Sequence, residues 1–285
     1  MLGSVMETGS TVTRFAPSPT GWLHLGHAHS ALFAWSQAKR QAGRFLLRIE
    51  DIDRSRVRPE FEQAIYEDLA WLGLDWERPV RRQSEHFADY AAALARLEAV
   101  GLLYPCFCTR AEIAGAGQAP HGLEHGLYPG TCRHLSAEER RVRIAAGRPY
   151  ALRLDAAEAA RHTGPLSFSD RAHGATAVDP FLLGDVVLAR KDTPASYHLA
   201  VTLDDALQGV TLVTRGEDLL PATHVHRLLQ ALLGLPEPAY HHHPLLRDEA
   251  GQRLSKRHSA LALRALREAG VSAAEARARA GFPDS

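Results

Sequence analysis

The stretch RFAPSPTGWLHLGH, residues 14–27, decides the fold of this 285-residue chain. It begins inside the apolar run VTRFA (12–16), which predicts a short buried strand, and its proline and glycine residues end that strand. A helix is predicted over 26–41, followed by a second strand, RFLLRIE, at 44–50. A strand, a helix and a strand in this order build parallel sheets, and nucleotides commonly bind at the edge of such sheets.

Two short segments suggest a phosphate site. His24 and His27 stand at the start of the first helix, where backbone N–H groups and the helix dipole favour a polyphosphate. From their spacing alone, the pair is also compatible with ordinary polar surface. Far downstream, GQRLSKRHS (251–259) is a basic, glycine-led loop centred on Lys256, typical either of a solvated turn or of a loop that folds over phosphates.

The remaining pattern predicts further helices and an insertion. One helix is expected from Pro59 to Gly73 and another from a Ser84 cap to Gly101. Irregular sequence rich in glycine, proline and histidine then runs from 106 to about 179, with ALRLD as a strand candidate. Strands resume with VVLAR and VTLVTR, and a last long helix is expected from Pro221 to Gly234.

Composition excludes several classes of protein. The 33 basic residues balance 33 acidic ones, so no global field attracts nucleic acid, and 45% hydrophobic residues predict a globular chain. No apolar run is long enough for a bilayer, and the first residues lack a secretory signal, so we expect a cytoplasmic protein. The three cysteines lie within 27 positions, which favours a metal site over disulfides.

Taken together, HLGH (24–27) and RLSKR (253–257) resemble the HIGH and KMSKS signatures of class I aminoacyl-tRNA synthetases. The resemblance narrows to the glutamyl group, because RIEDID (48–53) and DDALQGVTLVTRGEDLL (204–220) also look like that group. It covers approximately residues 12–260. It implies an α/β fold with a Rossmann-like catalytic core, interrupted by an inserted connective subdomain that normally holds the acceptor end of tRNA.

The same resemblance implies that the chain activates glutamate with ATP and Mg²⁺. Matched position by position, the catalytic residues are His24, His27 and Lys256, which with Gly26 also bind ATP. The glutamate-binding positions are Arg14, Phe15, Ala16, Pro17, Ser18, Glu50, Tyr197 and Arg215. One anion and two cations in this set suit an ammonium and two carboxylates. Which arginine meets which carboxylate stays open, and Tyr197 is also compatible with the core.

A full-length glutamyl-tRNA synthetase continues after its basic loop into an anticodon-binding module, whereas only 28 residues (285 minus 257) follow Arg257. The chain therefore resembles the truncated glutamyl-Q tRNA(Asp) synthetases, which attach glutamate to queuosine. In that family a Cys-x-Cys pair, a tyrosine and a cysteine bind one structural zinc ion, and the matching positions are Cys106, Cys108, Tyr128 and Cys132. His121 and His125 are alternative fourth ligands.

We expect a monomer whose partners are ATP, L-glutamate and queuosine-containing tRNA(Asp), with no membrane association. A minimal glutamyl-tRNA synthetase and a catalytically idle RNA-binding paralogue are the alternatives. The expected organisation is a disordered leader (1–11), two halves of the catalytic domain (12–105 and 180–260), the zinc-containing insertion (106–179) and a short helical tail (261–285).

Two further clusters of basic residues are not assigned to a site. His241, His242 and His243 are consecutive in a predicted strand, so their side chains alternate between faces and cannot all bind one ion. The arginines between 133 and 148 are interleaved with Glu138 and Glu139, which favours a solvated helix face over an RNA contact.

Overall fold

The computed structural model describes residues 10–109, 111–113, 127–247 and 262–283. Its strands are β1 (Val12–Phe15), β2 (Arg44–Ile49), β3 (Glu77–Arg82), β4 (Leu103–Cys106), β5 (Ala151–Leu154), β6 (Ser167–Asp170), β7 (Gly174–Ala177), β8 (Val187–Arg190), β9 (Leu212–Gly216) and β10 (Ala239–His243). Its helices are α1 (Leu25–Lys39), α2 (Pro59–Trp71), α3 (Phe87–Ala99), α5 (Ala137–Ala145), α6 (Ala156–Thr163), α7 (Tyr197–Leu207), α8 (Leu220–Leu233), α9 (Leu263–Glu268) and α10 (Ala273–Arg279). Two short 3-10 turns, η1 (Gln83–Glu85) and η2 (Glu217–Leu219), complete the set.

The central strands form a doubly wound parallel arrangement. β1 pairs with β2 and β2 with β3, while β9 pairs with β10 and β10 with β6, all of them parallel. The two groups meet where the Thr211 backbone N–H donates to the Val12 carbonyl (3.0 Å) and Arg14 reaches the Thr214 carbonyl (3.0 Å). β1 and β9 therefore run side by side in the same direction. The chain order reverses between them, and at such a switch point the carboxyl ends of the strands leave a crevice.

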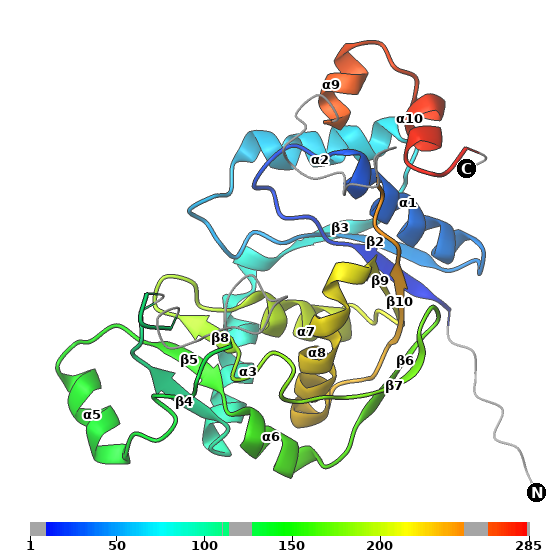
Figure 1. The fold of residues 1–285 in the computed structure, drawn as a ribbon. Coiled ribbons are helices and arrows are strands. Elements are labelled where there is room, and N and C mark those ends of the chain that lie inside the picture. The colour runs from blue at the N-terminus through cyan, green and yellow to red at the C-terminus, as the bar shows by residue number, and fades with distance from the viewer. Residues whose placement is uncertain (1–9, 110, 114–126, 248–261, 284–285) are drawn as a thin grey trace, which may run out of the picture.

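Helices cover both sides of this sheet. In Figure 1, α1, α2 and the tail helices α9 and α10 lie together above it, and α7 and α8 lie below it. The upper core contains fully buried leucines of α1 and α2, such as Leu32 and Leu69, together with Leu263 of the tail. The lower core joins Leu199 of α7 to Leu229 of α8. Burial of these apolar faces fixes the position of the strand ends between the two layers.

The insertion has its own small sheet. β5 pairs in antiparallel fashion with β4 on one side and β8 on the other. α5 lies beyond this sheet at the edge of the molecule, and α6 lies beneath it (Figure 1). β8 follows residue 179, so the sheet of the insertion includes a strand from the segment that also leads into α7.

The predicted Rossmann-like α/β core is confirmed, and the structure corrects one of the predicted helix starts. Ser84 does not cap a helix; it lies in a 3-10 turn, and its N–H and hydroxyl both donate to the Asp51 carboxylate (2.8 and 2.5 Å). The helix begins at Phe87 instead, without a side-chain cap. Ser84 has the residue type of a cap, but its N–H and hydroxyl bind the buried Asp51 carboxylate instead of the start of a helix. The segment SYHLAVTLDD (196–205), which lies between the predicted strands VVLAR and VTLVTR, contains the helix α7.

Candidate active site

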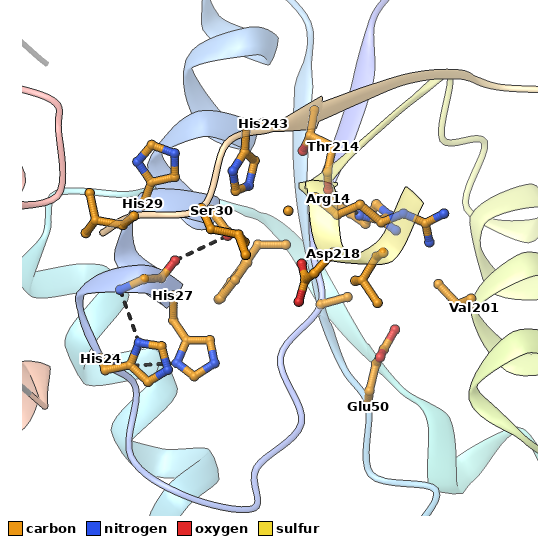
Figure 2. Close-up of a pocket in the computed structure, with 18 of the residues that line it drawn as sticks. Arg14, His24, His27, His29, Ser30, Glu50, Val201, Thr214, Asp218 and His243 are labelled. Atoms are coloured by element: carbon orange, nitrogen blue, oxygen red, sulfur yellow. Dashed lines mark hydrogen bonds between the residues drawn. The ribbon is translucent and has the colours of Figure 1, made fainter. Parts of the chain in front are cut away.

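A cavity of about 590 Å³ opens at the switch point between β1 and β9. Its walls include Arg14, Phe15 and Ala16 from the end of β1, and Arg215 from β9. The start of α1 forms another wall with His24, Gly26 and His27. Two further predicted site residues, Glu50 and Tyr197, also line the cavity. Figure 2 shows the two histidines on one side of the cavity, with Arg14 and Glu50 on the other. Phosphate-type and glutamate-type positions thus share one cavity.

The two histidines are held by the first turn of α1. Gly26 N–H donates to His24 Nδ1 (3.1 Å), His24 N–H donates to His27 Nδ1 (3.2 Å), and the rings stack with centroids 3.8 Å apart. Because both Nδ1 atoms accept, each neutral ring carries its proton on Nε2. The helix dipole adds positive potential at the same end. This arrangement suits hydrogen bonding to phosphate oxygens.

Arg14 belongs to a buried ion cluster. Its Nε and Nη2 donate to the two oxygens of Asp205 (2.9 and 3.3 Å), and Arg48 donates to the same carboxylate (2.8 Å). The fully buried Arg48 also contacts Glu50 (3.3 Å), and Asp204 lies 3.8 Å from its Nε. Although burial alone opposes it, the two arginines hold the pKa of Asp205 below its usual range. The charge of Arg14 is therefore already compensated within the protein.

Arg215 is buried in a different environment. It is 5% exposed, and its guanidinium donates to neutral groups among the described residues. Its Nε donates to His242 Nε2 (3.1 Å), its Nη2 to the Thr223 hydroxyl (2.7 Å), and its Nη1 to His226 Nδ1 (3.0 Å) and the Tyr197 hydroxyl (3.2 Å). Across the described residues, no carboxylate lies within ion-pair distance of Arg215. A buried cation without a counter-ion favours the binding of an anion.

The histidines around Arg215 are neutral at physiological pH. Burial, and next the charge of Arg215, lower the pKa of His242 to about 4 and hold the pKa of His226 well below 6.5. His242 Nδ1 donates to Asp170 (2.5 Å), so its Nε2 is left to accept from Arg215. His226 Nδ1 also accepts from Arg215, which places its proton on the Nε2 that faces His198 (3.2 Å). Asp170 thereby sets the tautomer of His242.

Glu50 and Tyr197 stand between the two arginines and a neighbouring cavity. Glu50 is 9% exposed, and burial raises the pKa of its carboxyl despite the nearby Arg48 and Arg14. Burial also raises the pKa of Tyr197. Since the Tyr197 oxygen accepts from Arg215, its own proton remains available to a ligand. The pair offers one negative charge and one hydroxyl donor to the cavity.

A second cavity of about 580 Å³ adjoins the first and shares Glu50 and Tyr197 with it. Ser18, one of the predicted glutamate-binding positions, is exposed and lines this second cavity. Pro17 lines neither cavity; its carbonyl accepts from the Glu50 backbone N–H (3.0 Å) and so helps to position that residue. Lys256 and the basic loop lie outside the described residues, as do His121 and His125.

The three cysteines form a compact cluster at the edge of the insertion. The Sγ atoms of Cys106, Cys108 and Cys132 lie within 4.8 Å of one another, and those of Cys108 and Cys132 are 3.5 Å apart. Tetrahedral zinc with bonds of about 2.3 Å separates two thiolates by roughly 3.8 Å, so the spacing fits a metal ion. The Tyr128 hydroxyl lies 3.9 Å from Cys108 Sγ and accepts from the Cys132 N–H (2.7 Å). The donor set can bind a metal such as zinc.

Several residues of this site escaped the sequence analysis, namely Asp170, His198, Asp205, Thr223, His226 and His242. Asp205 lay within a quoted motif without a role. The histidine triplet proves to be a strand, as predicted, and its side chains alternate: His242 faces Arg215, whereas His241 and His243 contact Phe33. A single histidine flanked by two that point away carries no sequence signal for contact with an arginine 27 positions earlier.

Comparison with known proteins agrees with this geometry. Residues 10–276 match the family of class I tRNA synthetases (E and Q), catalytic domain. A glutamyl-Q tRNA(Asp) synthetase of Rhodobacter capsulatus is 49% identical over 95% of this chain and 100% of its own length. The chain belongs to this family. It is thus a class I aminoacyl-tRNA synthetase-like enzyme.

More distant members of the wider family are longer. The glutamate–tRNA ligase of Aquifex aeolicus is 42% identical over 90% of this chain but only 54% of its own length. The crystal structure of the glutamate–tRNA synthetase from Elizabethkingia anophelis superposes with a TM-score of 0.75 at 32% identity, covering 87% of this chain and 53% of that protein. The glutamyl-Q family and the glutamate–tRNA ligases therefore share the catalytic fold described above. Across the described residues, no helix is long and apolar enough to span a bilayer.

Proposed function

We propose that this enzyme activates L-glutamate with ATP, without tRNA, and transfers it to the queuosine base in the anticodon loop of tRNA(Asp). The choice of acceptor rests on the similarity to the glutamyl-Q tRNA(Asp) synthetase of Rhodobacter capsulatus, which extends over the full length of that protein. The choice of amino acid rests on the cavity, which presents two buried arginines and one buried glutamate. The proposal includes a monomer that works in the cytoplasm.

In this proposal Glu50 binds the ammonium of glutamate, and Arg215 with Tyr197 binds its side-chain carboxylate. Arg215 lacks a counter-ion among the described residues, so it is best matched by the carboxylate that keeps its charge through the reaction. Arg14, already paired with Asp205, still has N–H donors to orient the substrate. Phe15 and Ala16 line the same cavity, Ser18 lines the neighbouring one, and the Pro17 carbonyl helps to position Glu50.

The α-carboxylate oxygen then attacks the α-phosphorus of ATP, and the bond to pyrophosphate breaks. His24 and His27 hydrogen-bond the phosphates from the start of α1, close to the backbone of Gly26, and Lys256 contributes positive charge from its loop. Mg²⁺ accompanies ATP and offsets phosphate charge. In the second step a queuosine hydroxyl oxygen attacks the carbonyl of the adenylate; AMP leaves and the hydroxyl proton is released.

One structural zinc ion is part of the proposal, held by Cys106, Cys108 and Cys132 with Tyr128 as the fourth ligand. The Tyr128 oxygen lies near the thiolates and would need to lose its proton. A site with four protein ligands leaves no open position for catalysis, so the ion would stabilise the insertion.

The decisive experiment measures pyrophosphate exchange and then locates the product. Exchange should require glutamate and proceed without tRNA, and radiolabelled glutamate should appear on a queuosine nucleoside after digestion of charged tRNA(Asp). Label on the terminal adenosine of tRNA(Glu) alone would assign the minimal glutamyl-tRNA synthetase instead. No exchange in folded protein would indicate an idle paralogue. His24→Ala and Lys256→Ala should each lower exchange at least about tenfold, from loss of charge stabilisation.

A further inference from the structure

A third cavity, of about 400 Å³, opens on the insertion beside the second one. It shares Ala189 and Arg190, at the end of β8, with the second cavity, which shares Glu50 and Tyr197 with the first. The three cavities are therefore neighbours that share wall residues, from the position of glutamate activation to the exposed part of the insertion.

The third cavity is lined by cations and one exposed aromatic ring. Arg148, Arg190 and Lys191 are exposed, and Tyr150 is 37% exposed. Within the described part of the chain, none of the three cations has a carboxylate within ion-pair distance. By contrast, Arg141 on neighbouring α5 is neutralised by Glu138 (2.7 Å). Unpaired cations beside an aromatic face are typical of surfaces that bind single-stranded nucleic acid.

Local packing holds these groups in place. Ala151 of β5 pairs with Arg190 of β8, and this register brings the adjacent Tyr150 beside Lys191 at the cavity wall. The guanidinium of Arg148 lies over the Phe107 ring at 5.8 Å. Glu112, whose pKa Arg148 helps to lower, uses its Oε2 to accept from Thr109. The cations are therefore positioned by the fold and remain available to an external anion.

The second cavity indicates how the acceptor approaches the activated glutamate from this surface. The acceptor must approach the activated glutamate without passing through the phosphate positions at His24 and His27, which line only the first cavity. The second cavity reaches Glu50 and Tyr197 from the other side and offers polar groups such as Ser18 and Ser196 to a hydroxyl-bearing base. A nucleotide inserted there would have its neighbours in the strand at the third cavity.

We propose that Arg148, Tyr150, Arg190 and Lys191 form a docking surface for the unpaired nucleotides that adjoin the acceptor base in the RNA. This inference rests on the proposed function, since it assumes an acceptor base in a single-stranded loop. Tyr150 stacks on one base, and the three cations bind the phosphates on either side of it. No base-specific contact is required, because stacking and phosphate binding tolerate any sequence.

A charge-reversal pair tests the phosphate contacts. The double variant Arg148→Glu, Lys191→Glu is compared with Arg141→Glu, Arg161→Glu, which changes the net charge equally at exposed arginines of the insertion that do not line the cavity. Removing two phosphate contacts should lower the slope of log affinity against log salt by about 1.4 for single-stranded RNA. KM for queuosine-containing tRNA(Asp) should rise in the first variant only, while tRNA-independent exchange stays at the parent level in both.

A second pair of variants tests the stacking and does not depend on charge. Tyr150→Ala should raise KM for the tRNA roughly fivefold to 150-fold, and Tyr150→Phe, which keeps the ring, should restore it to near the parent value. Parent-like KM and salt slope in both the charge variant and Tyr150→Ala would overturn the docking surface. A parent protein that exchanges pyrophosphate but labels no queuosine base would overturn the proposed acceptor, and the surface with it.

Discussion

Replacement of Asp170 by asparagine should weaken glutamate binding. The substitution changes the tautomer of His242, and His242 contacts Arg215, the residue proposed to bind the substrate. The Asp170 and His242 side chains are completely buried, and Asp170 Oδ2 accepts from His242 Nδ1 (2.5 Å). Asp170 Oδ1 accepts from the backbone N–H groups of Ala172 and His173 (2.8 and 3.0 Å). Asp170 Oδ2 also accepts from the backbone N–H of His242 (3.2 Å). In Asp170→Asn, an amide oxygen at the Oδ1 position leaves this one backbone N–H unsatisfied, whereas the opposite orientation leaves two, so the amide N–H₂ faces His242 Nδ1. His242 must then move its proton to Nε2.

That proton meets the Nε–H of Arg215, which now donates to His242 Nε2 at 3.1 Å. Leaving a buried donor unsatisfied costs about 1–3 kcal/mol, so KM for glutamate should rise roughly fivefold to 150-fold. The change of charge acts in the opposite direction, because removing the Asp170 anion strengthens the attraction of Arg215 for a carboxylate. A rise in KM therefore isolates the effect of geometry.

The assay is tRNA-independent pyrophosphate exchange, with KM measured separately for glutamate and ATP. KM for ATP should stay within about twofold, since the phosphate positions are not part of the network. Asp155→Asn is the matched control, because Asp155 also accepts from two backbone N–H groups, at the start of α6, and lies outside the cavity. An unchanged KM for glutamate in folded Asp170→Asn protein, or equal rises for both substrates, would refute the reasoning.

Three further changes should have measurable effects. Cys132→Ser should lower the zinc content of the purified protein and increase hydrogen exchange in β4, as measured by metal analysis and mass spectrometry; full zinc occupancy would contradict the proposed ligand set. Asp205→Asn should destabilise the fold by about 3–5 kcal/mol in urea unfolding, because two buried arginines lose their common partner; a loss below 1 kcal/mol would argue against the ion cluster. Burial lowers the pKa of several histidines below the unfolded value of 6.5, so unfolding takes up protons and stability should fall as pH drops from about 6.5 towards 4; a flat profile over that window would exclude these shifts. The histidines concerned are His198, His226, His242 and His243.

The parts of the fold that could be predicted are those governed by local sequence. The helices predicted from Pro59 to Gly73 and from Pro221 to Gly234 have apolar periodicity and clear end signals, and the structure has them at Pro59–Trp71 and Leu220–Leu233. α7 was missed because it is buried on nearly every side and carries Asp204 and Asp205 in its last turn, two acids that a sequence pattern assigns to the surface. Their partners Arg14 and Arg48 lie more than 150 residues away in the chain, which no local pattern encodes.

The candidate site also contains residues that local motifs predict and partners that only the tertiary structure shows. Arg14, Glu50 and Arg215 were predicted from motif matches, and the structure brings all three to one cavity. The motifs could not show which of the two arginines keeps its charge for the substrate, because that depends on partners supplied by tertiary contacts. Asp205 neutralises Arg14, whereas neutral histidines surround Arg215.

This difference between the arginines also bears on the choice of amino acid. Glutamine has the shape of glutamate but ends in a neutral amide, so in the proposed pose it would leave the buried charge of Arg215 without a counter-ion. It has one acceptor oxygen in place of two, so its amide N–H₂ would face either the remaining N–H of Arg215 or the Tyr197 hydroxyl proton. Glutamate removes both costs, because its carboxylate supplies the missing charge and accepts the remaining N–H of Arg215 together with the Tyr197 hydroxyl proton. Neutral partners around Arg215 thus keep its charge for the substrate, which a carboxylate in place of His226 or His242 would cancel.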